Sequence, residues 1–470
     1  MNKWVKKVVV VLFLLLTVSV VSCAEMDGKG NGAQASVPED DFKAALDTGK
    51  DSELYNRYEE YKENATLAFK SNAECGAADF EYEICENEVM IKKYIGGENI
   101  VVLPMHIDGA TVTSIAEGAF EGTSIRALYI PDTVKKIEKG ALSGCDTLVT
   151  LRLPFIGDGG NNTHIGYIFG ANSFDVNAVS VPPSLDMLII GEGTDEIGEN
   201  AFRGCKTLSA VILSDSVTKI DDLAFYECAD LVYLSLPKRV ESVGKYSFAY
   251  CRSLYSVDLT AVSEVGDGAL YSCASLNTLG YNPTEEDYLG RIFGAESVEY
   301  NCDFVPESLR NINIAEGCKK IGDMTFASCK YLTSVSLPES LESVGVRAFY
   351  ACRSLSGIDL PDSVKSVGDD AFFGCDAMSF ASFGKSLESL GMQAFYGCKS
   401  LRKAILPQSL KEIKSSTFYG CKSLEVIELG GVKTVGKDAF GGCDALLAVS
   451  CDGIDVGEGN GALTGNKQEN

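Results

Sequence analysis

The chain has 470 residues and a formal charge of −25, from 66 acidic and 41 basic residues. Such an acidic chain is a poor candidate for general nucleic-acid binding, which requires Lys and Arg to displace the counterions of phosphates. Hydrophobic residues make up 46% of the sequence, which excludes a chain that is disordered overall. Two histidines leave little for His-based catalysis or for a His-rich metal site.

The N-terminus has the features of an export signal. Lys3, Lys6 and Lys7 precede an uncharged run over residues 8–21, which is too short for the roughly 20 apolar residues that span a bilayer. The run fits the apolar region of a secretory signal peptide, which we place at residues 1–22. Val20-Val21-Ser22-Cys23 resembles the bacterial lipobox, and this resemblance implies that Cys23 carries a lipid anchor. The alternative is an ordinary secretory signal with an incidental cysteine.

Two segments of different composition follow the signal. Residues 23–39 are rich in Gly, Ala, Ser and Asp, which predicts a flexible tether. Residues 40–77 contain Leu46, Leu54, Tyr58, Tyr61 and Phe69 among many charges, which predicts one or two helices that form a spacer or cap.

A repeat of about 23 residues fills most of the remaining chain. Cysteines lie at 145, 205, 228, 251, 273, 329, 352, 375, 398, 421 and 443. An Ala-Phe pair precedes most of them, as in Ala371-Phe372 before Cys375. A Leu-x-x-apolar-x-apolar segment, such as Leu355/Ile358/Leu360, recurs at the same interval. We count fourteen such segments, the last ending at residue 451, and Val101/Leu103 ends a degenerate fifteenth.

This period predicts the fold class. Alternating inward and outward residues in each segment indicate a short strand. A single repeat cannot bury its own apolar side, so the copies must stack. The sequence therefore predicts a β-rich solenoid over residues 78–451, with one short parallel strand per repeat, followed by a tail at 452–470.

The same residues carry a resemblance to a known family. Pro361-Asp362-Ser363-Val364-Lys365-Ser366-Val367-Gly368 through Cys375 resembles the BspA-like leucine-rich repeat nearly throughout. The resemblance implies the right-handed coil of leucine-rich repeats. It also implies a surface-exposed protein, since several members of the family are linked to adhesion and to contact with host or other bacterial cells.

Two insertions, near 154–184 and 282–308, interrupt the repeat. They resemble each other at a spacing of 124 residues: Gly166-Tyr167-Ile168-Phe169 matches Gly290-Arg291-Ile292-Phe293. Insertions in repeat proteins often line a binding face. The alternative, favoured by the apolar Ile-Phe pairs, is that each insertion packs against the solenoid and restarts the stack.

The cysteines do not indicate catalysis or metal binding. Eleven of them occupy one repeat position, as residues buried for packing do, and no two have CxxC spacing. We expect a reduced, buried column of thiols, although disulfides between neighbouring repeats are the alternative, and Cys75 and Cys85 could also form one. No nucleophile has a recurring base beside it. We therefore expect neither an enzyme nor a bound cofactor or metal.

Function is then expected on the outward strand positions. In the N-terminal half these positions are rich in large side chains: Tyr129, Arg152, Ile189, Ile212 and Tyr233. We interpret them as a candidate binding face for a protein of a host matrix or another surface, with burial under an insertion as the alternative. We expect a structural role for a second set of aromatic residues, which comprises Tyr350, Phe373, Tyr396 and Tyr419.

The sequence thus predicts a lipid-anchored recognition or adhesion protein at the bacterial surface. It would sit in the outer membrane if the cell has two membranes, and otherwise on the outer face of the cell membrane. The alternative is a structural envelope lipoprotein without a specific ligand.

Overall fold

The computed structural model describes residues 56–57, 74–160, 163–284, 287–447 and 454–460. The predicted signal peptide, the tether and Cys23 lie outside these residues, as does most of the predicted helical segment at 40–77. Of that segment the structure describes Asn56 and Arg57, which are helical, and residues 74–77. Among the described residues no helix is long and apolar enough to cross a membrane.

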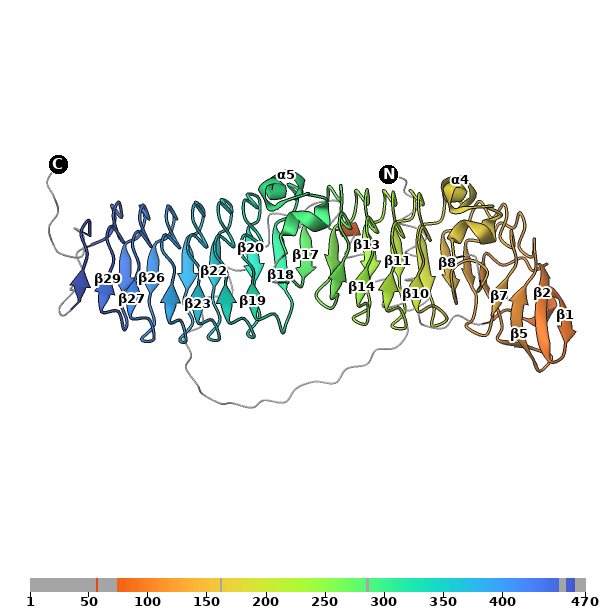
Figure 1. Ribbon diagram of the computed structural model, residues 1–470. Helices are drawn as coiled ribbons and strands as arrows, with labels where there is room; N and C mark the ends of the chain where they lie inside the picture. Colours follow the sequence, from red (N-terminus) through yellow and green to blue (C-terminus); the bar gives the residue numbers. More distant parts are fainter. Residues whose placement is uncertain (1–55, 58–73, 161–162, 285–286, 448–453, 461–470) are drawn as a thin grey trace, which may run out of the picture. The chain divides into compact units, whose positions relative to one another are not determined.

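The repeats stack through a column of short parallel strands, the first strand column (Figure 1). Neighbouring copies pair in register, as Val211 does with Leu234. The solenoid is therefore confirmed, and thirteen of the fourteen predicted strands are described. The fourteenth falls at residues 448–453, outside the described residues, and β3 confirms the degenerate copy. The column comprises β3 (Ile100–Val102), β6 (Ala127–Tyr129), β8 (Thr150–Leu153), β9 (Met187–Ile190), β11 (Ala210–Ile212), β13 (Tyr233–Ser235), β15 (Ser256–Asp258), β17 (Thr278–Tyr281), β18 (Asn311–Ile314), β20 (Ser334–Ser336), β22 (Gly357–Asp359), β24 (Phe380–Ser382), β26 (Lys403–Ile405) and β28 (Val426–Glu428).

A second strand column, which the sequence analysis did not predict, consists of two-residue strands. The glycine after most of these strands explains why the backbones can pair here: a Cβ on Gly368 would lie 2.6 Å from the carbonyl carbon of Gly345 in the neighbouring repeat, closer than atoms can approach. The column comprises β7 (Lys136–Ile137), β10 (Glu196–Ile197), β12 (Lys219–Ile220), β14 (Ser242–Val243), β16 (Glu264–Val265), β19 (Lys320–Ile321), β21 (Ser343–Val344), β23 (Ser366–Val367), β25 (Ser389–Leu390), β27 (Glu412–Ile413), β29 (Thr434–Val435) and β30 (Asp455–Val456).

An antiparallel hairpin begins the stack. It consists of β1 (Phe80–Cys85) and β2 (Glu88–Tyr94), preceded by η2 (Ala77–Asp79). β2 then pairs in parallel with β5 (Ala110–Ile115), which also pairs with β4 (His106–Ile107) and β7. At the end of β2, Tyr94 stacks on Phe120 with ring centroids 5.8 Å apart. Tyr94 therefore occupies the position that phenylalanine holds in the repeats that follow.

The two segments that interrupt the repeat share one structure. The first contains η3 (Ile165–Phe169), η4 (Phe174–Val176) and α4 (Asn177–Ser180), and the second contains η5 (Leu289–Phe293), η6 (Val298–Tyr300) and α5 (Asn301–Phe304). Figure 1 shows α4 and α5 on the same side of the stack. The first strand column continues past both insertions, because β8 pairs with β9 and β17 pairs with β18.

The C-terminal tail predicted at 452–470 begins too early. β30 pairs with β29, so the second strand column extends to Val456. Asn460 is 3% exposed and closes the stack, because its Oδ1 accepts the backbone N–H of Phe440 at 2.9 Å and its Nδ2 donates to the Gly457 carbonyl at 2.7 Å. The error arose because the strand motif ends at 451, whereas each repeat has a second strand beyond that motif.

Phenylalanine rings form two stacks inside the solenoid, one from Phe202 to Phe248 and one from Phe326 to Phe440. Neighbouring rings in the C-terminal half, such as Phe349, Phe372 and Phe395, lie 5.2 and 5.0 Å apart and are fully buried. The backbone N–H of most of these phenylalanines donates to an alanine carbonyl of the next repeat, as Phe349 does to Ala371 at 2.8 Å. Ring stacking and this hydrogen bond therefore hold neighbouring repeats together at one point.

We predict that Phe372→Ala destabilises the chain by about 3–5 kcal/mol, because it leaves a cavity in the middle of the stack. Phe373, next in sequence, is only partly buried, so Phe373→Ala is the matched control and should cost clearly less. Urea unfolding followed by circular dichroism measures both. Equal losses for the two variants would contradict the assignment of Phe372 to the core.

Candidate binding face

Strand register brings four of the five predicted face residues into one line. Tyr129 pairs with Arg152, Arg152 with Ile189, and Ile189 with Ile212. Tyr233 lies on the next strand, paired with Ala210. We call these five residues the N-terminal face. They point away from the core, since Leu188, Val211 and Leu234 between them belong to the inner cluster.

The N-terminal face is nevertheless not open to solvent. Ile189, Ile212 and Tyr233 are only 0%, 3% and 9% exposed, and they form a small apolar cluster with Ala210 that is separate from the core. The expectation of an exposed patch is therefore wrong for these three residues.

The other two predicted residues also have local roles. Arg152 donates through Nη2 to Asp132 Oδ2 and through Nη1 to the Ile130 carbonyl, both at 2.6 Å. These bonds hold its guanidinium on the preceding repeat. Tyr129 is half-buried, and burial raises the pKa of its hydroxyl. The guanidinium of Arg152 therefore does not project freely toward a partner.

An apolar patch that the sequence analysis missed lies on the C-terminal strands. Phe380, Ile405 and Val426 face outward from β24, β26 and β28 and are 45%, 46% and 43% exposed. These strands are neighbours in the first column. We call these three residues the C-terminal patch. Applying the same alternation to the last three strands would have found it.

Charged side chains around the C-terminal patch are paired with one another. Lys403 Nζ lies 3.7 Å from Glu428 Oε1, and Lys385 Nζ lies 2.8 Å from Asp362 Oδ2. This second contact raises the pKa of Lys385 and lowers that of Asp362. Beside the patch lies an open hollow lined by Lys385, Ile405, Leu406, Pro407, Gln408, Glu428 and Gly430. Lys403 and Glu428 lie on β26 and β28 themselves, in register with Val426 and Ile405, so the surface combines apolar side chains with a neutralised ion pair.

A model of the BspA type leucine rich repeat region matches six copies in the chain, over residues 105–166, 172–293, 296–379 and 343–454. The chain belongs to the BspA-type leucine-rich repeat family. The match covers both candidate surfaces and both insertions. No curated protein matches the chain in sequence.

The chain is also similar to several solved structures. A leucine-rich repeat protein from Bacteroides ovatus is 22% identical, with 76% of this chain and 99% of that chain covered and a TM-score of 0.36. A leucine rich cell surface protein from Faecalibacterium prausnitzii is also 22% identical, with 85% and 99% covered and a TM-score of 0.26. The pneumococcal vaccine antigen PcpA is 18% identical, with 83% and 99% covered and a TM-score of 0.25.

The cysteines of the BspA-type repeats are free and buried, in keeping with the predicted reduced column. Their thiols also donate hydrogen bonds, which the sequence did not reveal. Cys375 Sγ donates to the Phe349 carbonyl of the preceding repeat at 3.3 Å, and that carbonyl also accepts the backbone N–H of Cys352 at 3.2 Å. Cys75 and Cys85 are free as well.

Burial makes these thiols poor nucleophiles. It raises the pKa of Cys205 and Cys352 to about 12, against an ordinary value of 9.0. The thiolate is the reactive form, so these groups are inert near neutral pH. Among the described residues, no three His, Cys, Asp or Glu side chains gather where they could hold a metal ion.

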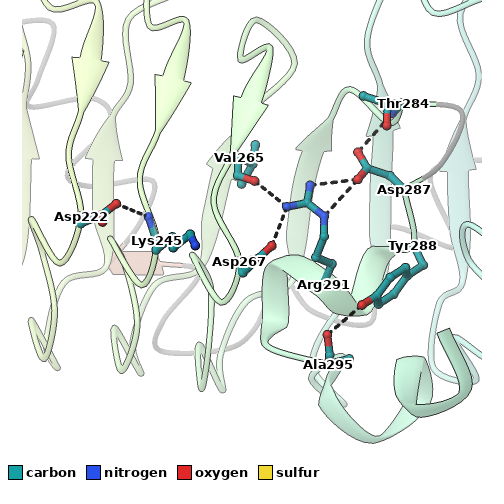
Figure 2. A network of polar contacts seen from close by, with 9 residues as sticks. All are labelled: Asp222, Lys245, Val265, Asp267, Thr284, Asp287, Tyr288, Arg291 and Ala295. Atoms are coloured by element: carbon teal, nitrogen blue, oxygen red, sulfur yellow. Dashed lines mark hydrogen bonds and ion pairs between the residues drawn. The ribbon is translucent and has the colours of Figure 1, made fainter. Parts of the chain in front are cut away.

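The second insertion is fixed to the repeats by an arginine (Figure 2). Arg291 lies 2.9 Å from Asp287 and donates to Asp267 at 3.0 Å and to the Val265 carbonyl at 2.8 Å. Desolvation opposes its charge, but the hydrogen bond to Asp267 and the charge of Asp287 outweigh it and raise the pKa of Arg291. The network joins the insertion to the repeat that contains β16 rather than presenting a charge outward.

A buried asparagine organises each insertion, at positions 177 and 301. Asn177 Oδ1 accepts the backbone N–H of Gly166 at 3.1 Å, and Asn301 Oδ1 accepts that of Gly290. His164 Nδ1 lies 2.9 Å from Asn177 Oδ1, so that nitrogen carries the proton and the histidine has a structural role. The 124-residue spacing of the two asparagines is the sequence feature that could have identified them. As predicted, Ile168-Phe169 and Ile292-Phe293 are buried.

The thiol pKa values predict loss of stability at high pH. In the unfolded chain the thiols ionise near pH 9, whereas in the folded chain they stay protonated until about pH 12. Between these values the unfolded state releases more protons, so the free energy of unfolding falls by about 1.4 kcal/mol per pH unit for each thiol. The urea concentration at the unfolding midpoint should therefore decrease as the pH rises from about 8 to about 11, the range in which an unfolded thiol ionises. Cys205→Ala should weaken this pH dependence, and an unchanged slope would contradict the assignment to the thiols.

Proposed function

We propose that the chain recognises another protein through the C-terminal patch, as a surface-attached BspA-type repeat protein. The observation that carries this proposal is the exposure of three large apolar side chains on neighbouring strands of a solenoid whose other apolar residues mostly fill its core. An exposed apolar patch with a polar rim is typical of a protein-binding surface.

The chemistry of the surface supports a protein partner with apolar side chains and a basic margin. Phe380, Ile405 and Val426 offer contact area without hydrogen-bonding groups, which suits apolar side chains. The net charge of −25 favours approach by a cationic partner. Since the patch lies on paired strands, binding does not require ordering of the backbone.

Surface attachment follows from the N-terminal sequence features. The positively charged start, the apolar run and Cys23 support export with a lipid anchor, and the resemblance to BspA-like proteins supports exposure at the cell surface. We propose recognition or adhesion as the role, with contact to a host matrix protein or to another cell.

We predict that Phe380→Ser/Ile405→Ser/Val426→Ser weakens attachment about tenfold or more, since truncating central apolar residues removes at least about 1.4 kcal/mol of binding free energy. Cells displaying the full chain are tested for attachment to immobilised extracellular-matrix proteins and to other bacterial cells. Unchanged attachment with an intact fold would contradict a role for the patch.

Val346→Ser/Met392→Ser is the matched control for this experiment. Both side chains are exposed to a similar degree, 40% and 46%, but they follow β21 and β25 in the second strand column. Attachment should stay unchanged in this variant. If cells lacking the whole chain attach normally, the structural envelope role is favoured instead. Sedimentation of the purified chain tests whether the patch pairs with a second copy.

We predict that Cys23→Ser abolishes lipid attachment while leaving export intact. The wild-type chain should partition into the detergent phase of a Triton X-114 extract, because two or three acyl chains anchor a protein stably. The variant should move to the aqueous phase. A wild-type chain that stays in the aqueous phase would contradict the lipid anchor.

A further inference from the structure

Two isoleucines at equivalent positions differ sharply in exposure. Ile212 is the last residue of β11 and Ile405 is the last residue of β26, and both point away from the core. Ile405 is 46% exposed, whereas Ile212 is 3% exposed. Neither residue type nor strand position explains the difference, so part of the chain must lie over Ile212.

One described contact identifies that part of the chain. Arg57 Nη2 donates to Ser209 Oγ at 3.2 Å, and Ser209 directly precedes β11. Asn56 and Arg57 are helical. A helix therefore reaches the first strand column from the N-terminal side of the sequence, beside Ile212 and Tyr233.

The length of the chain between described residues fits a helix along the N-terminal face. The backbone N–H of Cys75 donates to the Val102 carbonyl, which places residue 75 beside β3. Four strand spacings separate β11 from β3, about 19 Å at roughly 4.8 Å each. A helix over residues 58–74 would extend about 25 Å at 1.5 Å per residue, whereas an extended chain would reach about 56 Å.

The sequence of this segment has the required apolar stripe. In a helix continued from Arg57, Leu54, Tyr58, Tyr61, Ala65 and Ala68 recur at intervals of three or four residues and share one face. That face carries two aromatic rings and a leucine, which match the apolar outward side chains of β9, β11 and β13. Arg57 borders the stripe, where it can reach Ser209.

We infer that the N-terminal face is the docking site for residues 54–69 of the same chain. The segment lies as a helix across β6 to β13, with its apolar stripe on Ile189, Ile212 and Tyr233. It occupies the surface that sequence alone marked as the binding face, and it leaves the C-terminal patch open. The inference does not depend on the proposed function, since it involves no external ligand.

A tryptophan introduced by Tyr58→Trp tests this docking in the full chain. Trp4 is the single tryptophan of the sequence, so Trp4→Phe/Tyr58→Trp leaves one reporter, in what we call the reporter parent. We expect blue-shifted emission and weak quenching by acrylamide. Adding Ile212→Asp should raise the quenching constant at least about threefold, because an unpaired charge would be buried against the helix.

Two further variants of the reporter parent separate docking from a change in the solenoid. Phe380→Asp places the same charge on the open patch and should leave the quenching constant unchanged. Leu54→Ser/Tyr61→Ser alters only the segment and should expose the reporter tryptophan as Ile212→Asp does, even if Ile212→Asp itself unfolds the chain. Circular dichroism confirms that each variant remains folded.

The inference is overturned if the reporter tryptophan is as accessible in the reporter parent as in Leu54→Ser/Tyr61→Ser while the solenoid is folded. It is also overturned if shielding disappears on dilution, because the segment would then be docking on a second copy. Shielding that is independent of concentration and lost in the segment variant supports docking within one chain.

Discussion

The solenoid depends on hydrogen bonds between neighbouring repeats, which no repeat can make by itself. The backbone N–H and C=O of most core phenylalanines are satisfied by the next repeat. A backbone carbonyl, usually that of an alanine, accepts the N–H, and a cysteine thiol donates to the C=O, as Ala371 and Cys375 do for Phe349. Because an unsatisfied buried backbone group is costly, these bonds keep successive copies in register, and they require a side-chain donor at the cysteine position. Ring stacking at 4.9–5.5 Å then follows from the strand spacing.

The insertions make the same kind of backbone hydrogen bond to the neighbouring repeats. The backbone N–H of Leu142 donates to the Ile168 carbonyl, and that of Ile165 donates to the Ala201 carbonyl. The segment around η3 thus takes the place of an Ala-Phe turn between two ordinary repeats. Each insertion is a lengthened repeat rather than a separate domain, which explains why the first strand column continues past it. Asn177 and Asn301 supply hydrogen bonds that the missing turn would have made.

This dependence explains what sequence could and could not reveal. Inward residues recur because every copy meets the same neighbours, so Phe372 or Leu360 could be assigned from spacing alone. The second strand column was missed because it consists of only two residues per copy and relies on close approach at glycines such as Gly368. The exposed fraction of an outward-facing side chain, by contrast, does not recur from one repeat to the next. The burial of Ile212 has no counterpart in the repeat pattern, and the contact that points to its cause is the one between Arg57 and Ser209.

The same series of hydrogen bonds also determines how the two ends of the stack are closed. At the first end, the Tyr94 N–H donates to the Ala119 carbonyl, so β2 supplies the ring and the peptide group of a repeat. At the other end, Asn460 accepts the Phe440 N–H that a further alanine carbonyl would otherwise accept. Both ends of this hydrogen-bond series are therefore satisfied within the chain, which disfavours end-to-end association of copies. We therefore propose that a partner approaches from the side, where the outward positions of β24, β26 and β28 present apolar side chains to solvent.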